Sequence, residues 1–163
     1  NGITGLKTGS TDKARFCMSA TAERKGISLC AVVMGCDTGE IRFSCSAALL
    51  DYGFSAFEKF ELAQGLTLPE ITVRYGEVEK LLPVFEATAP VLIPKNSASS
   101  VEHDMNCESA ITAPVSKGQV LGFVVAKQNG EVLGRVNIIA PEAVQKLSFF
   151  KALYRLISSF ALF

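Results

Sequence analysis

The first sixty residues contain two kinds of apolar pattern. Three short apolar runs of strand length cover residues 3–9, 15–22 and 27–34. The polar, glycine-containing segment Glu23–Gly26 separates the last two runs and predicts a hairpin. From residue 40 to residue 53 the apolar side chains recur every three or four positions, which predicts a helix. The third run is almost wholly apolar, so we expect a strand covered on both faces.

The middle of the chain, residues 63–142, has prolines between short apolar runs. Proline interrupts helices, so this spacing favours strands. Asn129-Gly130 lies between two of the runs and predicts a tight hairpin turn. Many short strands with regular turns predict a small all-β sandwich. The expected strands are Ile71–Tyr75, Val84–Ala87, Val91–Ile93, Ser109–Ala113, Val120–Lys127 and Val132–Ile139.

The last segment, residues 143–163, has its apolar side chains on one half of a helical wheel. Pro141 followed by Glu142 suits a helix start. An apolar face opposite Lys151 and Arg155 is typical of a helix in the membrane interface, although a helix packed on the protein's own core or on a neighbour would show the same pattern. The side chains expected to enter the membrane are Phe149, Phe150, Leu153, Tyr154, Ile157 and Phe160.

Composition and charge narrow the class of protein. With 163 residues, 48% hydrophobic and 20% charged, the chain has a globular composition, and its formal net charge of zero argues against a general nucleic-acid binder. The net charge is +1 over residues 1–60 (seven basic, six acidic), −4 over 61–142 (six and ten) and +3 over 143–163 (three and none). These differences suggest three structural units. No apolar run is long enough for a transmembrane helix.

The sequence gives little support for a metal site or for a Ser-His-Asp catalytic triad. None of the five cysteines forms a C-x-x-C pair, so no metal site is expected, and buried inert thiols or disulfides are the alternatives. His103 precedes Asp104, but a solvent-exposed loop histidine is a simpler interpretation than a catalytic triad. Asp12 and Asp37 are expected to make turn or cap contacts rather than a catalytic carboxylate pair.

The motif with the clearest chemistry is Lys7-Thr8-Gly9, at the end of the first expected strand. It stands within Gly5–Ala14, and Val33-Met34-Gly35, Leu49–Phe54 and Ala113–Gln119 follow it. Together these segments resemble the D-alanyl-D-alanine carboxypeptidases, the low-molecular-mass penicillin-binding proteins, over nearly the whole chain.

The resemblance implies an α+β fold in three parts. Residues 1–62 would be the C-terminal part of a penicillin-binding, β-lactamase-like transpeptidase domain, with antiparallel strands and a helix. Residues 63–142 would be the family's β-sandwich C-terminal domain. Residues 143–163 would be its amphipathic membrane-anchor helix.

The resemblance also implies roles for individual residues. Lys7, Thr8 and Gly9 would bind the terminal carboxylate of a peptide, and the backbone N–H of Ser10 would donate to the oxyanion. Arg42 would help to hold the carboxylate, and otherwise it would be a solvated residue in the first turn of a helix. Ser10 stands where many members have His or an aromatic residue, and Arg15 stands where Gly is common.

The family's nucleophile and base are expected outside this chain. The family supplies them from an S-x-x-K motif and adds an S-x-N loop, and S-x-N is absent here. Ser10–Lys13 and Ser148–Lys151 match S-x-x-K, but the first overlaps the K-T-G strand and the second lies in the expected anchor. The chain, which starts at Asn1 without a signal-peptide pattern, is therefore interpreted as processed, nicked or truncated.

The resemblance implies an enzyme of the bacterial cell wall. It would remove the terminal D-alanine from peptidoglycan stem peptides at the extracytoplasmic face of the cell membrane, without metal or cofactor, and β-lactams would acylate its serine. This chain alone would be inactive, and an N-terminal fragment of the same protein or a second copy would cover residues 1–60. The alternative is a non-catalytic, membrane-associated β-sandwich that binds or scaffolds a partner, and an upstream S-x-x-K would decide between them.

Overall fold

The computed structural model describes residues 2–153, and the chain divides into two compact units. Unit 1 comprises Asn1–Phe60 and Leu92–Ser99, and unit 2 comprises Glu61–Val91 and Ser100–Phe163. The elements in chain order are β1 (Ile3–Thr11), β2 (Arg15–Arg24), β3 (Ile27–Cys36), α1 (Gly39–Ala56), β4 (Phe57–Phe60), β5 (Ile71–Arg74), β6 (Lys80–Leu81), β7 (Val84–Phe85), β8 (Val91–Pro94), the 3-10 turn η1 (Ala98–Ser100), β9 (Val101–Cys107), β10 (Ala110–Thr112), β11 (Val120–Gln128) and β12 (Glu131–Ile139).

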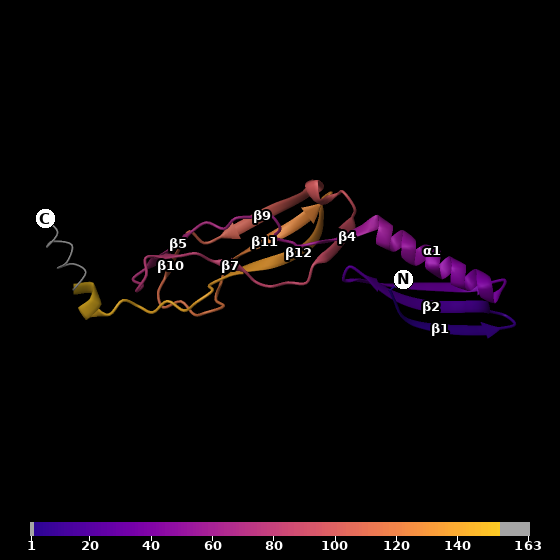
Figure 1. Ribbon diagram of the computed structural model, residues 1–163. Coiled ribbons are helices and arrows are strands. Elements are labelled where there is room, and N and C mark those ends of the chain that lie inside the picture. The colour runs from indigo at the N-terminus through magenta and orange to yellow at the C-terminus, as the bar shows by residue number, and fades with distance from the viewer. Residues whose placement is uncertain (1, 154–163) are drawn as a thin grey trace. The chain divides into compact units, whose positions relative to one another are not determined.

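Unit 1 contains an antiparallel sheet in the order β1-β2-β3, and helix α1 packs against β2 and β3 (Figure 1). The three apolar runs predicted the strands, and the helical period predicted α1. The stripe that carries this period is nevertheless exposed, because Ile41, Leu49 and Tyr52 are 40%, 49% and 67% exposed. The helix buries Ser46 and Leu50 instead. Thr38 begins the helix, because its Oγ1 accepts a hydrogen bond from the N–H of Ile41 at 3.2 Å. The core between sheet and helix consists of Met18, Ala20, Ala22, Ala31 and Leu50.

The other face of this sheet remains open in the described chain. Successive residues of a strand point to opposite faces, and Leu29, Ala31 and Val33 of β3 lie on the side of α1. The alternate residues Val32 and Met34 are 59% and 78% exposed. The sequence predicts that both faces of β3 are covered. The described residues cover only the face toward α1.

Unit 2 is mostly β-structure, as predicted. One sheet has the strand order β10-β5-β6, and the other has the order β7-β12-β11-β9. The hairpin between β11 and β12 turns at Asn129-Gly130, where both residues have positive φ values of 52° and 83°. Asn and Gly tolerate this conformation better than other residues do, so the sequence prediction of a tight turn is confirmed.

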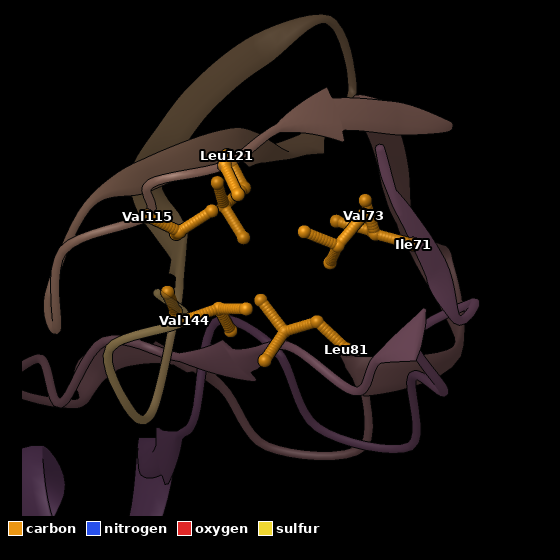
Figure 2. Packing of buried hydrophobic residues seen from close by; sticks show 8 residues of the cluster. Ile71, Val73, Leu81, Val115, Leu121 and Val144 are labelled. Atoms are coloured by element: carbon orange, nitrogen blue, oxygen red, sulfur yellow. The ribbon is translucent and has the colours of Figure 1, made fainter. Parts of the chain in front are cut away.

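The main core of unit 2 draws side chains from both sheets. Figure 2 shows Ile71 and Val73 of β5 and Leu81 of β6 gathered with Leu121 of β11. Val115 and Val144, from connecting segments, complete the labelled cluster. A second cluster contains Leu62, Ala126 and Val136. Burial of apolar residues from both sheets in the main cluster stabilises this unit.

The helix predicted from Pro141 onward does not begin there. Val144 is 4% exposed and forms a β-bridge with Val115, with backbone N–O distances of 2.8 and 2.9 Å. Leu147 donates its backbone N–H to the carbonyl of Tyr75 at 2.8 Å. Val144, the first apolar residue of the predicted helical stripe, thus belongs to the β-core, because extended chain here both buries its side chain and satisfies its backbone. Helix begins at residue 149 and continues to the end of the described part.

The loop predicted around His103 is also wrong. His103 lies in the middle of β9, which pairs with β11, and its Nε2 is 3.0 Å from the carbonyl oxygen of Leu62. His103 is partly buried, and the carboxylate of the adjacent Asp104 pairs with Lys127 at 2.5 Å. The two residues are therefore not arranged as members of a catalytic triad. The polar composition of Val101–Cys107 obscured a strand in which alternate residues are partly buried.

Candidate functional site

The four residues of the predicted site from Lys7 to Ser10 lie together on β1. In the described residues β1 is an edge strand, with β2 as its neighbour, and Thr8 pairs with Met18 while Ser10 pairs with Phe16. Thr8 is half-buried, whereas Lys7 is exposed and its Nζ donates to the carbonyl of Thr8 at 2.8 Å. An edge strand leaves backbone groups available for another extended peptide.

Arg42 reaches this strand from the first turn of α1. Its Nη1 donates to the carbonyl oxygen of Gly9 at 3.5 Å, although the two residues are 33 positions apart. The guanidinium lies over the rings of Phe16 and Phe43, at 5.5 and 5.3 Å from their centroids. These contacts fix the charge beside β1. The buried Nε of Arg42 has no hydrogen-bond partner among the described residues.

A polar hollow of about 500 Å³ lies at the end of β1. Ser10 lines it together with Arg15 and Asp37, which form an ion pair. This pair was not foreseen, since Asp37 was expected in a turn or cap and Thr38 is the residue that caps α1. The strand register explains how this pair forms. Phe16 of β2 pairs with Ser10 of β1 on one side and with Cys36 of β3 on the other. Arg15, which precedes Phe16, and Asp37, which follows Cys36, are therefore brought together near Ser10.

Cys36 is the thiol whose titration this environment changes. Desolvation raises the pKa of Cys36, the nearby Cys45, Cys17 and Asp37 raise it further, and Arg42 lowers it by a smaller amount. A raised pKa keeps this thiol protonated at neutral pH. Since the thiolate is the reactive form of cysteine, Cys36 is not an activated nucleophile.

Ser148–Lys151, the second S-x-x-K string, is not arranged as a nucleophile with its base. The side chain of Lys151 forms an ion pair with Glu77 at 2.6 Å. No group of three or more His, Cys, Asp or Glu side chains suited to a metal ion occurs in the part of the chain that the structure describes.

The structure describes the expected membrane anchor only as far as Leu153. Phe149, Phe150 and Leu153 are 74%, 78% and 42% exposed and belong to the helical stretch 149–153. The other expected anchor residues, Tyr154, Ile157 and Phe160, lie outside the described residues. Within residues 2–153, no helix combines the length and the apolar character needed to cross a bilayer.

Residues 57–146 match the family described as "Penicillin-binding protein 5, C-terminal domain". The chain belongs to this family. It is 31% identical over 156 residues to the D-alanyl-D-alanine carboxypeptidase DacF of Bacillus subtilis, covering 94% of this chain and 40% of the relative. It is 30% identical over 150 residues to the carboxypeptidase DacC of Escherichia coli, covering 91% and 38% respectively.

Solved structures give the same assignment. Penicillin-binding protein 5 from Haemophilus influenzae superposes with a TM-score of 0.63 at 31% identity, over 89% of this chain and 43% of that protein. This chain therefore corresponds to a C-terminal portion, about two fifths of the length of the relatives it matches. The family resemblance drawn from the K-T-G segment and its context is confirmed.

Proposed function

We propose that this chain is the C-terminal portion of a D-Ala-D-Ala carboxypeptidase that trims the stem peptides of peptidoglycan. The names of relatives such as DacF and DacC support this proposal. The observation that carries it is the contact of Arg42 with the carbonyl of Gly9, because it brings a second cation to the strand of Lys7 and Thr8. Two cations and a hydroxyl on one strand edge suit a peptide that ends in a carboxylate.

Each of these residues has a distinct part in binding. The Lys7 ammonium and the Thr8 hydroxyl hold the terminal carboxylate by charge and hydrogen bond. Arg42, fixed between Phe16 and Phe43, adds positive charge beside the same strand. The peptide lies along the edge of β1, and the backbone N–H of Ser10 donates to the oxygen that becomes negative during the reaction.

The reaction itself needs a serine and a lysine that precede Asn1. The serine hydroxyl attacks the carbonyl between the two D-alanines, forms an acyl ester and releases the terminal D-alanine. Water then hydrolyses the ester and frees the serine. A β-lactam acylates the same serine. Neither step requires a metal or cofactor.

The open face of the sheet in unit 1 supports the presence of an N-terminal part. The exposed Val32 and Met34 lie opposite the face that α1 covers. Apolar area left in water forfeits about 25 cal/mol per Å², so a covering partner stabilises this sheet. We assign that partner as the N-terminal portion of the same protein, with a second copy of this chain as the alternative.

The exposed aromatic residues of stretch 149–153 support attachment to a membrane surface. Phe149 and Phe150 pack edge to face, with ring centroids 5.9 Å apart, and both remain largely exposed. Aromatic side chains near a basic residue such as Lys151 are characteristic of helices in the membrane interface. The proposed location is the extracytoplasmic face of the cell membrane, where the substrate lies.

Labelling with a fluorescent penicillin tests the proposed mechanism. The protein expressed from its complete gene is expected to become covalently labelled on a serine that precedes Asn1. After proteolysis, peptides from the present 163 residues are expected to remain unlabelled. Label within this chain would contradict the placement of the nucleophile. No label on a folded protein would favour the non-catalytic binding or scaffold module instead.

A further inference from the structure

A second hollow, of about 380 Å³, lies within unit 1 at the other end of its sheet from Ser10. Four basic side chains line it: Arg24, Lys25, Lys59 and Lys95. Arg24 ends β2, Lys25 lies in the turn before β3, Lys59 lies in β4, and Lys95 follows β8. The volume is within the range of small-molecule sites.

Two of these cations already have fixed positions. The Arg24 guanidinium pairs with Asp51 at 2.7 Å and stacks 4.6 Å above the centroid of Phe54. Lys95 donates from Nζ to the carbonyl of Phe54 at 3.1 Å, and this bond uses one of its three N–H donors. The hollow is thus partly preorganised, which lowers the entropy cost of binding a ligand.

Lys25 and Lys59 line the hollow with ammonium N–H donors that are available to a ligand. Within the described residues their ammonium groups make no hydrogen bond or ion pair, and both side chains are exposed. Lys59 lies directly against the turn, because a Cβ added at Gly26 would come 2.8 Å from its Nζ. Glycine with φ of +71° at this position both forms the turn and leaves room for the ammonium.

The charge balance of the hollow selects the kind of ligand. Glu58 is the one carboxylate that lines it, and its Oε1 accepts the backbone N–H of Asn96 at 3.0 Å. With Asp51 counted as the partner of Arg24, four positive charges face two negative ones. A phosphate monoester carries about −1.5 to −2 charges near neutral pH and offers three acceptor oxygens. A carboxylate offers a single charge and two oxygens.

We propose that this hollow binds a small phosphate monoester. The phosphate accepts hydrogen bonds from Lys25, Lys59 and Lys95, and the organic part lies along the rings of Phe54 and Phe57, which are half-buried in the wall. Lysines bind phosphate as point charges, and three of them around one group give the site its preference for a dianion. This binding site does not depend on the proposed peptidase activity.

Calorimetric titration of the protein expressed from its complete gene tests the site. Glycerol phosphate is expected to bind saturably, whereas acetate at the same ionic strength is not. Lys59→Gln is expected to weaken binding about tenfold or more, the usual effect of losing a charged hydrogen bond. Lys80→Gln is the matched control, because that ammonium lies in unit 2 and pairs with Glu70 at 2.6 Å.

Vesicles that contain phosphatidic acid, a lipid whose headgroup is itself a phosphate monoester, separate a soluble ester from a lipid headgroup as the source of phosphate. Binding of glycerol phosphate that is lost in Lys25→Gln and Lys59→Gln, at unchanged melting temperature, supports the proposal. It is overturned if glycerol phosphate does not bind, if acetate binds equally well, or if both lysine variants bind as the unaltered protein does. Binding to vesicles without binding of glycerol phosphate also overturns it.

Discussion

Arg15 stands at a position where the backbone itself favours glycine. Its φ is +53°, in the left-handed region, and glycine is common at this position in the family that the sequence resembles. The Arg15 side chain pairs with Asp37 and lines the hollow that Ser10 also lines. The departure from the family pattern therefore places a charged pair at the end of the proposed substrate strand.

Lys7 is the residue whose replacement bears most directly on substrate binding. Lys7→Ala in the protein expressed from its complete gene is expected to lower kcat/KM for a D-Ala–D-Ala peptide about 10- to 150-fold. This corresponds to the loss of a charged hydrogen bond worth about 1.5–3 kcal/mol in the transition state. Thr8→Val should act in the same direction and less strongly, since it removes a neutral hydroxyl.

The matched control for this measurement is Lys13→Ala. Lys13 is equally exposed but lies in the turn after β1, so its removal changes the net charge by the same amount without touching the carboxylate site. The role of Lys7 is refuted if both variants retain the kcat/KM of the unaltered protein.

At the scale of elements, local pattern predicted the type of each element in unit 1 and the Asn129-Gly130 turn. It did not predict which face of α1 is buried, because Ile41, Leu49 and Tyr52 of the apolar stripe remain exposed while Ser46 and Leu50 are buried. Val144 and Leu147 could not be placed in this way, because their partners Val115 and Tyr75 are distant in the sequence. For β9, polar residues concealed an alternation that pairing with β11 makes visible.

The extended stretch before residue 149 also determines how the anchor is tested. A truncation from residue 143 would remove Val144 from the core and destabilise unit 2, so the deletion should begin at Ser148. Loss of 148–163 is expected to abolish sedimentation with anionic vesicles. Each buried Phe contributes about 1.5–3 kcal/mol of transfer free energy, so Phe149→Ser with Phe150→Ser should also weaken binding strongly.

The deletion is informative only if unit 2 remains folded, which an unchanged melting temperature would establish. The double variant Lys13→Gln with Lys80→Gln, altered outside the anchor, controls for the loss of the two positive charges of Lys151 and Arg155. A folded deletion variant that still sediments with the vesicles would show that another surface attaches the protein.

For the whole molecule, the family assignment explains why much of the site was accessible from sequence and part of it was not. Lys7, Thr8, Gly9 and Ser10 are consecutive, so a short motif was sufficient to predict them as a candidate site. The aromatic contacts of Arg42 and the Arg15–Asp37 pair depend on the register of β1, β2 and β3, and a motif does not contain that information.

The proposed function depends on recognition of a free terminal carboxylate by this chain within a larger enzyme. Release of D-alanine by the protein expressed from its complete gene, from a peptide ending in D-Ala–D-Ala, tests this most directly. Release of one D-alanine per peptide is expected, with little release from the same peptide carrying an amidated C-terminus. Absence of D-alanine release from the folded protein, or equal release from the amidated peptide, would contradict it.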